Sequence, residues 1–410
     1  MALKILSISC LYPHPGHPGK GTFLRSRLQH VARWAELKIV APIALLEAAE
    51  CSTAVPANRN DENIEVLHPR WGYLPGTGCI TPLLLGLQLL RPLSRVRESF
   101  RFNLIDAHFG YPDGIAAALV SWSMGIPFCV TLRGSEVLHG RYPTRRILMR
   151  WALRRAGRVI TVSQRLHQFA ITLGVDSRRI KTIPNGIESS IFYPRDRVTA
   201  RQRFGIDERV RLIVTAGHLI ELKGHHHVIQ SVKRLAEQRL PVRLLIAGGA
   251  PNRGVTSFET HLRSLVSELK IQQSVEFLGQ LSPETLADLM SAADVFCLAS
   301  SREGWPNVVH EALACGTPVV ATDVGAVREL IPSDCYGLII PASDPMLLDD
   351  ALSRALETTW DREAIAAWGQ SRSWEQVAKE VLREMYAVIA ERQRTVLSNS
   401  VAFQDPQARA

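Results

Sequence analysis

The stretch VFCLASSREGWPNVVHEALACGTPVVATD, residues 295–323, is the most informative part of the chain. Its pattern predicts a buried strand, a loop, a short helix and a second buried strand. We expect Asn307 to be the N-cap of the helix, residues 308–315 to be helical and Gly316 to end it. The amino end of such a helix carries unpaired backbone amides and partial positive charge, which favours the binding of a diphosphate.

Two glutamates flank the amino end of this predicted helix. Glu303 lies in the loop before it, and Glu311 lies about one turn inside it. Carboxylates in these positions can accept hydrogen bonds from the hydroxyl groups of a ribose and of a sugar ring. An arbitrary pair of glutamates is more often solvated, and the spacing alone does not identify a hydrolase acid and base.

Apolar runs that read as strands alternate with helical patterns along the whole chain. This alternation predicts an α/β protein with two doubly wound, Rossmann-like domains, since 410 residues exceed the usual size of one core. Turn formers from Pro184 to Pro194 favour a boundary at 193/194, which gives domains at 1–193 and 194–372. An amphipathic helix is expected over 373–393, and residues 394–410 are expected to be disordered. The predicted strands are 4–9, 37–42, 104–108, 128–133, 158–163, 211–217, 243–249, 275–279, 295–300 and 318–323.

Composition is ordinary for a soluble globular protein, with 46% apolar and 21% charged residues. The seven cysteines form no C-x-x-C pair, which favours reduced thiols in a cytosolic protein. The longest apolar run, 80–90, is too short to span a bilayer, and the first residues resemble a strand rather than a signal peptide. We therefore expect a cytoplasmic protein, either free or peripheral on the inner face of the membrane.

Basic charge is concentrated in the first half of the chain. Residues 1–190 hold 24 Lys and Arg against 12 Asp and Glu, whereas residues 191–410 hold 24 against 27. Within 141–158, arginines recur every four residues, which predicts a basic amphipathic helix. Such a helix could contact anionic lipid headgroups, or it could be an ordinary solvated face. No interleaved aromatic pattern points to nucleic acid. The recurring arginines are Arg146, Arg150, Arg154 and Arg158.

Three other features of the sequence are candidates for site residues. The loop that follows the first strand contains Gly19 and Gly21, which could approach a diphosphate or could form a plain turn. His108 ends a predicted strand at the edge where open parallel sheets bind ligands, although a lone histidine is more often structural. Arg133 ends the next strand and could stabilise phosphate charge. The consecutive histidines 225–227 are not expected to converge on a metal, because neighbouring residues face different sides of a helix.

The segment Glu303-Gly304-Trp305-Pro306-Asn307-Val308-Val309-His310-Glu311 resembles the Glu-x7-Glu motif of retaining glycosyltransferases of family 4. The resemblance extends along nearly the whole chain, and it implies the GT-B fold, with two domains facing a central cleft and a C-terminal helix crossing back to the first. In that family Glu311 would bind the ribose hydroxyls and Glu303 the transferred sugar. Backbone amides of Asn307, Val308 and Val309 would hold phosphate and sugar.

Other matches to the family are partial. Lys223 matches a cation that clamps the donor diphosphate, whereas His218 stands where an arginine is usual. Gly217 and Gly248 match glycines in loops beside the nucleotide. Arg133 occupies a position where many members have a histidine, so His108 is the alternative histidine. The catalytic candidates are therefore Glu303, Lys223, His108 and Arg133, and the donor-binding candidates are Glu311, Asn307, Val308, Val309, Gly304, Gly217, His218, Gly248, Gly19 and Gly21.

The resemblance implies transfer of a sugar from a UDP- or GDP-sugar to a glycan or lipid-linked acceptor, without a metal or another cofactor. Bacterial members of the family commonly build exopolysaccharide or lipopolysaccharide. Two other readings remain open. One is an epimerase or phosphorylase of the same fold, and the other is a non-catalytic nucleotide-sugar-binding protein. A dinucleotide oxidoreductase is disfavoured, because no G-x-G-x-x-G joins a strand to a helix in the required place.

Overall fold

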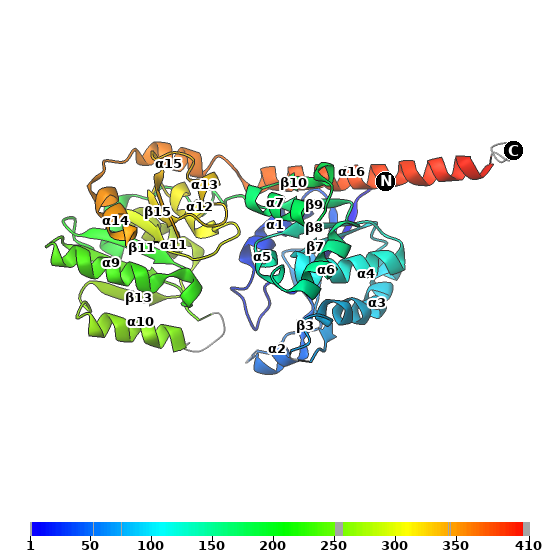
Figure 1. The fold of residues 1–410 in the computed structure, drawn as a ribbon, viewed down its shortest axis with the longest axis horizontal. Helices are drawn as coiled ribbons and strands as arrows, with labels where there is room; N and C mark the ends of the chain where they lie inside the picture. The colour runs from blue at the N-terminus through cyan, green and yellow to red at the C-terminus, as the bar shows by residue number, and fades with distance from the viewer. Residues whose placement is uncertain are drawn as a thin grey trace. The chain divides into compact units, whose positions relative to one another are not determined.

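The computed structural model describes residues 2–51, 53–74, 76–250, 257–342, 344 and 346–404. The chain forms two compact units, one of Met1–Asn185 with Trp374–Ala410 and the other of Gly186–Ser373 (Figure 1). Residues 186–193, expected in the first domain, belong to the second unit. The Ile187 amide donates to the Arg372 carbonyl at 2.9 Å, and this backbone contact ties the segment to the end of the second unit.

The first unit is built on an eight-stranded sheet with the order β10-β9-β8-β7-β1-β2-β5-β4. Its pairs are parallel except for β4 with β5. Strand order reverses between β1 and β7, and ligands of such sheets bind at the carboxyl ends of the strands beside this point. The strands are β1 (Lys4–Ile8), β2 (Glu36–Val40), β4 (Asn58–Asp61), β5 (Ile64–Leu67), β7 (Leu104–His108), β8 (Phe128–Leu132), β9 (Arg158–Thr161) and β10 (Ile180–Thr182), and a separate pair is β3 (Ile43–Ala44) and β6 (Arg70–Trp71).

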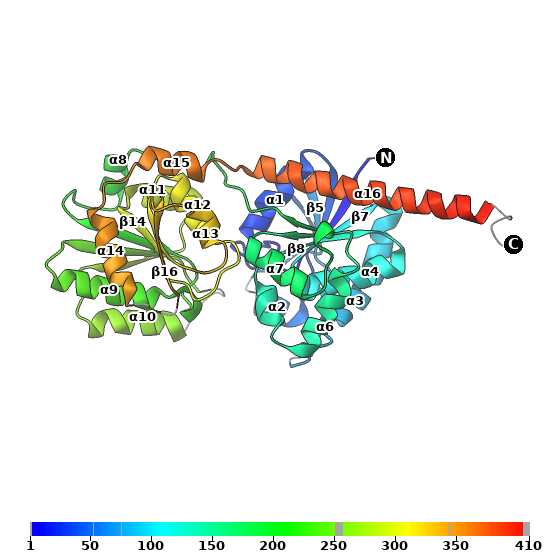
Figure 2. The ribbon, with the colours of Figure 1, turned by 45° about the horizontal axis from the view of Figure 1, so that its top comes forward.

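Helices of the first unit bury their apolar sides against this sheet (Figures 1 and 2). Those that pack on one face include α1 and the C-terminal α16, whose Val377, Val381 and Met385 are buried as their spacing predicts. The helices are α1 (Thr22–Ala32), α2 (Leu45–Glu50), α3 (Thr81–Ser99), α4 (Ile115–Met124), α5 (Ser135–His139), α6 (Pro143–Leu153), α7 (Gln164–Thr172) and α16 (Trp374–Gln404), with shorter turns η1 (Gly110–Gly114) and η2 (Ser177–Arg179).

The second unit has a six-stranded parallel sheet with the order β13-β12-β11-β14-β15-β16. Helices α9, α10 and α14 bury one face of it. Strand order reverses between β11 and β14, which places the expected ligand edge at their carboxyl ends. The elements are α8 (Arg197–Arg203), β11 (Arg211–Ala216), η3 (Glu221–Lys223), α9 (His225–Glu237), β12 (Val242–Ala247), α10 (Ser257–Glu268), β13 (Val275–Gly279), α11 (Pro283–Ala292), β14 (Val295–Leu298), α12 (Asn307–Ala314), β15 (Val319–Thr322), α13 (Val327–Leu330), β16 (Gly337–Ile340), α14 (Leu347–Glu357) and α15 (Arg362–Gly369).

Each strand predicted from the sequence is present, and the fold is the predicted pair of Rossmann-like α/β domains. The additional short strands, among them β4, β10 and β16, lack a long apolar run. Helix α16 continues to Gln404, beyond the predicted end at 393, and residues 405–410 lie outside the described residues. No glycine or proline interrupts 374–404, and the first proline after the helix start is Pro406, which disfavours helix at the residue before it.

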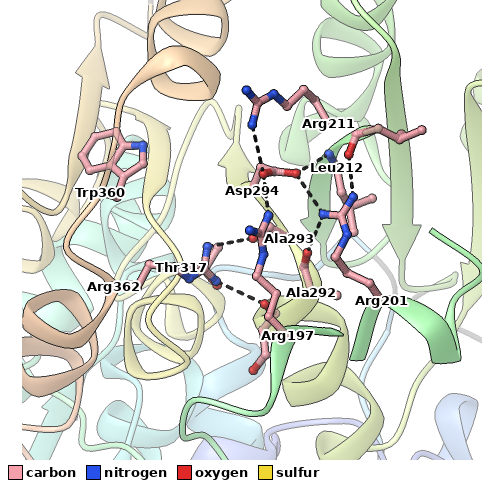
Figure 3. Close-up of polar contacts among 12 residues, drawn as sticks. Arg197, Arg201, Arg211, Leu212, Ala292, Ala293, Asp294, Thr317, Trp360 and Arg362 are labelled. Carbon is pink, nitrogen blue, oxygen red and sulfur yellow. Dashed lines mark hydrogen bonds and ion pairs between the residues drawn. The ribbon is translucent and has the colours of Figure 1, made fainter. Parts of the chain in front are cut away.

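At the amino edge of the second sheet, Asp294 joins four backbone and side-chain partners (Figure 3). Its carboxylate accepts from the Leu212 amide at 2.7 Å, from Arg197 at 2.5 Å and from Arg201 at 3.2 Å, and it lies 3.7 Å from the Arg211 guanidinium. Arg362 donates to the carbonyls of Ala293 and Ser291, at the end of α11. Arg201, which donates to the Ala292 carbonyl at 3.3 Å, and Arg362 thus satisfy carbonyl groups that the end of α11 leaves without partners. The cluster stabilises the unit at the edge opposite its expected ligand edge.

Candidate functional site

The second unit brings Lys223 and Glu303 together at the carboxyl ends of β11 and β14. The Lys223 ammonium lies 2.6 Å from Oε1 of Glu303, and the Ser300 hydroxyl donates to the same oxygen at 2.7 Å. Their side chains are 20% and 11% exposed, so the pair is partly shielded from water. Two of the predicted catalytic residues therefore meet at the point where the strand order reverses. Ser300 was missed by the sequence reasoning, and its place just before Glu303 was the available signal.

Glycines allow the loops of this edge to approach one another. Gly224 has φ +67°, and a Cβ there would lie 2.0 Å from the Ala299 carbonyl oxygen. Gly248, after β12, has φ +140°, and its Cβ would lie 1.8 Å from the carbonyl oxygen of Gly217. Any larger residue would separate these loops. The predicted donor residues Gly217 and Gly248 thus lie against each other, in loops that adjoin the Lys223 turn.

Helix α12 begins at Asn307 with Pro306 as its N-cap, so Asn307 is not the N-cap that the sequence predicted. The Val309 amide donates to the Pro306 carbonyl at 3.0 Å, so it is not one of the unpaired amides expected at this helix end. The proline ring fixes φ and leaves no amide hydrogen. The Pro306 carbonyl accepts the first hydrogen bond of the helix, so the helix begins at Asn307, one residue before the predicted start at 308. Val308 remains in the first turn, and the helix ends before Gly316, which has φ +74°.

Glu311 lies on α12 with its side chain partly buried. Burial raises the pKa of its carboxyl group to about 7, because a charged carboxylate loses water there. When this carboxyl group is ionised, it lowers the stability of the folded protein. Hydrogen-bond donors on a bound ligand would reduce that cost.

A second residue that the sequence reasoning missed is Gly325. It has φ +54°, and a Cβ would lie 2.6 Å from the Gly304 carbonyl oxygen and 2.7 Å from that of Glu303. The Ala326 amide donates to the Gly304 carbonyl at 3.0 Å. Gly325 therefore supports the loop that carries Glu303. The turn that follows β15 is visible in the sequence, but the loop against which it packs is not.

The histidines near Lys223 occupy three different environments. His218 lies on the loop after β11 with its surface exposed, and partial loss of water around the ring, followed by the Lys223 charge, lowers its pKa. His225 is buried, and its Nε2 lies 3.2 Å from the His218 carbonyl oxygen, so it supports that loop. The rings of His226 and His227 lie 3.9 Å apart. This pair lies in the first turn of α9, and its rings are closer than expected for neighbours on different faces of a helix. In the described part of the chain, no group of three or more possible metal ligands converges.

In the first unit, the glycine loop has a clear structural function at Gly21. This residue has φ +68°, and a Cβ would lie 1.8 Å from the Leu11 carbonyl oxygen. Gly19 is exposed in the same loop. Lys20, between them, pairs with Glu47 at 2.5 Å, so part of the local positive charge is already compensated within the unit.

His108 and Arg133 meet at the carboxyl edge of the first sheet, as their strand positions predict. Arg133 Nη2 donates to Nδ1 of His108 at 3.3 Å, and Nη1 donates to Asn185 Oδ1 at 3.2 Å. The His108 ring is fully buried, and burial lowers its pKa to about 4, so the ring is neutral. Arg133 also lies over the Phe23 ring, with 5.0 Å between the guanidinium carbon and the ring centroid.

The predicted basic helix is α6, which is shorter than the arginine pattern. Arg158 starts β9, where its guanidinium hydrogen-bonds to Glu384 at 2.9 Å and to Glu391 of α16, so it is not part of the helical stripe. Arg150 and Arg154 are exposed, whereas the half-buried Arg146 donates to the Thr172 carbonyl at 3.2 Å. Among the described residues, no helix combines the length and apolar character needed to cross a bilayer.

Comparison with known proteins agrees with this architecture. The family profile described as Glycosyltransferase Family 4 matches residues 49–190, and the one described as Glycosyl transferases group 1 matches residues 196–372. A Bacillus subtilis protein assigned by its name to teichuronic acid biosynthesis, TuaC, is 28% identical over 88% of this chain and 91% of its own length.

Two solved structures show the same fold. Sucrose-phosphate synthase from Thermosynechococcus elongatus has a TM-score of 0.77 at 20% identity, covering 95% of this chain and 100% of the other. Anabaena HepE in complex with UDP-glucose has a TM-score of 0.72 at 20% identity, covering 94% and 100%. The predicted GT-B fold is confirmed. With matching profiles in both of its units, the chain is a glycosyltransferase of the GT-B type.

Proposed function

We propose that the chain is a retaining glycosyltransferase that moves a sugar from a UDP- or GDP-sugar to a glycan or lipid-linked acceptor. The observation that carries the proposal is the Lys223–Glu303 pair at the edge where the strand order reverses in the second unit. Similarity to HepE, whose structure contains UDP-glucose, supports the donor class. Similarity to TuaC, which is named for teichuronic acid biosynthesis, supports a role in glycan biosynthesis. As the product class we propose a cell-surface polysaccharide such as exopolysaccharide or lipopolysaccharide.

In this mechanism the donor diphosphate becomes more negative as the bond to the sugar breaks. The Lys223 ammonium has three donors, so it can keep one on Glu303 and offer others to the diphosphate. The amino end of α12, at Asn307 and Val308, contributes backbone amides. We also assign to Arg133, in the first unit, a role in stabilising phosphate charge. These groups stabilise the leaving group without a metal.

The two glutamates bind hydroxyl groups. Glu303 accepts from the transferred sugar, and Glu311 accepts from the ribose. Both carboxylates lose water in the folded protein, so they are matched to donors on a ligand. Gly217, Gly248, His218 and Gly304 shape the loops around the donor. Gly19 and Gly21 shape the corresponding loop of the first unit.

The decisive experiment combines donor binding with product analysis. A thermal-shift screen of nucleotide sugars identifies the donor, because a ligand of the native state raises the melting temperature. Transfer is then measured for Lys223→Met and Glu303→Gln, with Lys233→Met as a matched control that breaks only the surface pair with Glu237. We expect losses of about a hundredfold in the first two variants and none in the control.

Other outcomes would select the other functions. A product epimer formed from the donor alone, without acceptor, would show an epimerase. Donor binding with wild-type glycan levels in cells that carry Lys223→Met or Glu303→Gln, but no glycan when the protein is deleted, would show a non-catalytic binder. A product that has lost the donor's anomeric configuration would contradict the retaining mechanism.

We also propose that α6 binds an anionic membrane surface through Arg146, Arg150 and Arg154, where a lipid-linked acceptor would be presented. Ile147 of α6 is 65% exposed, and Tyr142, the residue before the helix, is 50% exposed. These side chains give the arginines apolar neighbours. Replacing Arg150 and Arg154 by glutamine should reduce co-sedimentation with vesicles that contain phosphatidylserine. The control replaces the exposed Arg209 and Arg239 of the second unit, and equal binding by both double variants would refute the membrane proposal.

A further inference from the structure

Beneath Arg133, the first unit contains a row of buried charged groups. Asp106 and His108 are two residues apart on β7, and Thr131 and Arg133 are two apart along β8 and its extension. Residues two apart on a strand face the same side. His108 is the register partner of Thr131, so the four side chains form one cluster on one face. Helix α1 covers this face and adds Arg27, whose Nη1 donates to the Thr131 hydroxyl at 2.9 Å.

The members of this row are nearly inaccessible to water. Asp106 and His108 are 0% exposed and Arg27 is 1% exposed. One Asp106 oxygen lies 3.0 Å from His108 Nε2 and 3.9 Å from Arg27 Nη2. These contacts are between charges and lack hydrogen-bond geometry: among the described residues, no group hydrogen-bonds to either Asp106 oxygen, to His108 Nε2, or to Nε and Nη2 of Arg27. Burying such charges is costly, and a purely apolar core would stabilise the sheet at least as well.

The geometry determines which ring nitrogen of His108 carries the proton. The Arg133 guanidinium can only donate, so Nδ1 of His108 accepts from it, and the neutral ring carries its proton on Nε2, which lies 3.0 Å from the Asp106 carboxylate. Nδ1 is therefore occupied by Arg133, and Nε2 carries the proton. His108 has no free lone pair with which to take a proton from an acceptor. Its contact with Arg133 instead fixes one arm of that guanidinium, while Asn185 fixes the other.

We infer that Asp106 and Arg27 are positioning residues for the reaction, and that they act through His108 on Arg133. Arg27 lies 3.9 Å from Asp106, Asp106 lies 3.0 Å from His108 Nε2, and His108 accepts from Arg133, so this row fixes the orientation of the Arg133 guanidinium. This inference rests on the proposed function, because Arg133 is assigned there to phosphate charge. It replaces an acid–base role for His108 with an orienting one.

The first test reads the tautomer directly. Nitrogen-15 histidine NMR of the whole chain at neutral pH, with the His108 signals assigned by their loss in His108→Gln, should show a neutral ring protonated at Nε2. Ser7→Ala is the control, because it changes a buried side chain of β1 that is the register partner of Asp106, and it should leave the His108 signals unchanged. A ring protonated at Nδ1, or one charged at neutral pH, would overturn the inference whatever the chain catalyses.

The second test is a double-mutant cycle on kcat. Asp106→Asn should lower kcat about tenfold or more in the wild-type background, because a small misplacement of a catalytic group is costly. In an Arg133→Lys background the same change should cost less than about twofold, since the group to be oriented is gone. Equal losses in the two backgrounds would show a merely structural role and would overturn the inference. If Asp106→Asn does not fold, Arg27→Met takes its place in the same double-mutant cycle.

Failure of the inference can be told apart from failure of the proposed function. The Asp106→Asn variant should lose much less in donor affinity than in kcat, because Arg133 is assigned to the charge that develops on the phosphate during the reaction. If the wild-type chain binds no nucleotide sugar and transfers none, the proposed function fails, and the NMR measurement still decides the tautomer. If transfer occurs and the cycle is additive, only the positioning role fails.

Discussion

Replacing Glu311 by glutamine should stabilise the protein and weaken donor binding at the same time. Burial raises the pKa of this carboxyl from the ordinary value of 4.5 to about 7, so the folded state resists its ionisation. Each pKa unit corresponds to about 1.4 kcal/mol, which gives a cost of about 3 kcal/mol once the group is fully ionised. Glutamine has nearly the same shape and no charge, so it removes this cost.

The sign of the pH dependence follows from the same shift. The folded pKa is above the unfolded one, so the folded state binds more protons between pH 4.5 and about 7. The contribution of Glu311 to stability is therefore most favourable at low pH and is lost as the pH rises through this window. The advantage of Glu311→Gln over the wild type should be close to zero at the low end and should reach about 3 kcal/mol above neutral pH.

Scanning calorimetry at pH 4.5 and pH 8 measures this difference, with UDP titration as the second readout. Glu208→Gln, at an exposed loop position of the same unit, is the matched control and should change neither. Affinity for UDP should fall about tenfold or more in Glu311→Gln, because hydrogen bonds to a charged acceptor are stronger. An equal stability difference at both pH values would refute the burial argument, and unchanged UDP affinity would remove Glu311 from the donor site.

Three further predictions follow from single contacts. Gly325→Ala should destabilise the second unit by at least about 1 kcal/mol more than Gly205→Ala does, and should lower the rate of transfer. The reason is that Gly205 has a similar φ of +61° with nothing within 4 Å, so an equal loss would contradict the clash with the Glu303 loop. Asp294→Asn should lower the free energy of unfolding of the second unit by about 3 kcal/mol, since it leaves Arg201 buried without its charge partner, and an unchanged denaturation midpoint would refute this. Arg158→Met should speed amide exchange in α16 around Glu384 and Glu391, and unchanged protection there would show that apolar packing alone holds the helix.

Local features of this protein were determined by the sequence alone. The alternation of short apolar runs with helical patterns predicts the strands of both sheets, because strand and helix periodicities depend only on neighbouring residues. The spacing of Glu303, Asn307, Glu311 and Gly316 predicts the loop and helix that carry the donor candidates. The apolar stripe of α16 is likewise visible as Val377, Val381 and Met385.

Only the tertiary structure decided which of these residues meet. Lys223 and Glu303 are 80 positions apart, and they pair because Gly224 lets one loop pass against the Ala299 carbonyl of another. Arg158 continues a helical arginine pattern but belongs to β9, because the chain turns at Gly157 and α16 supplies two carboxylates for it. Arg27 carries no sequence signal for its contact with Asp106. Burial and long-range pairing depend on how the sheets and helices pack, and this information is shared among residues far apart in the chain.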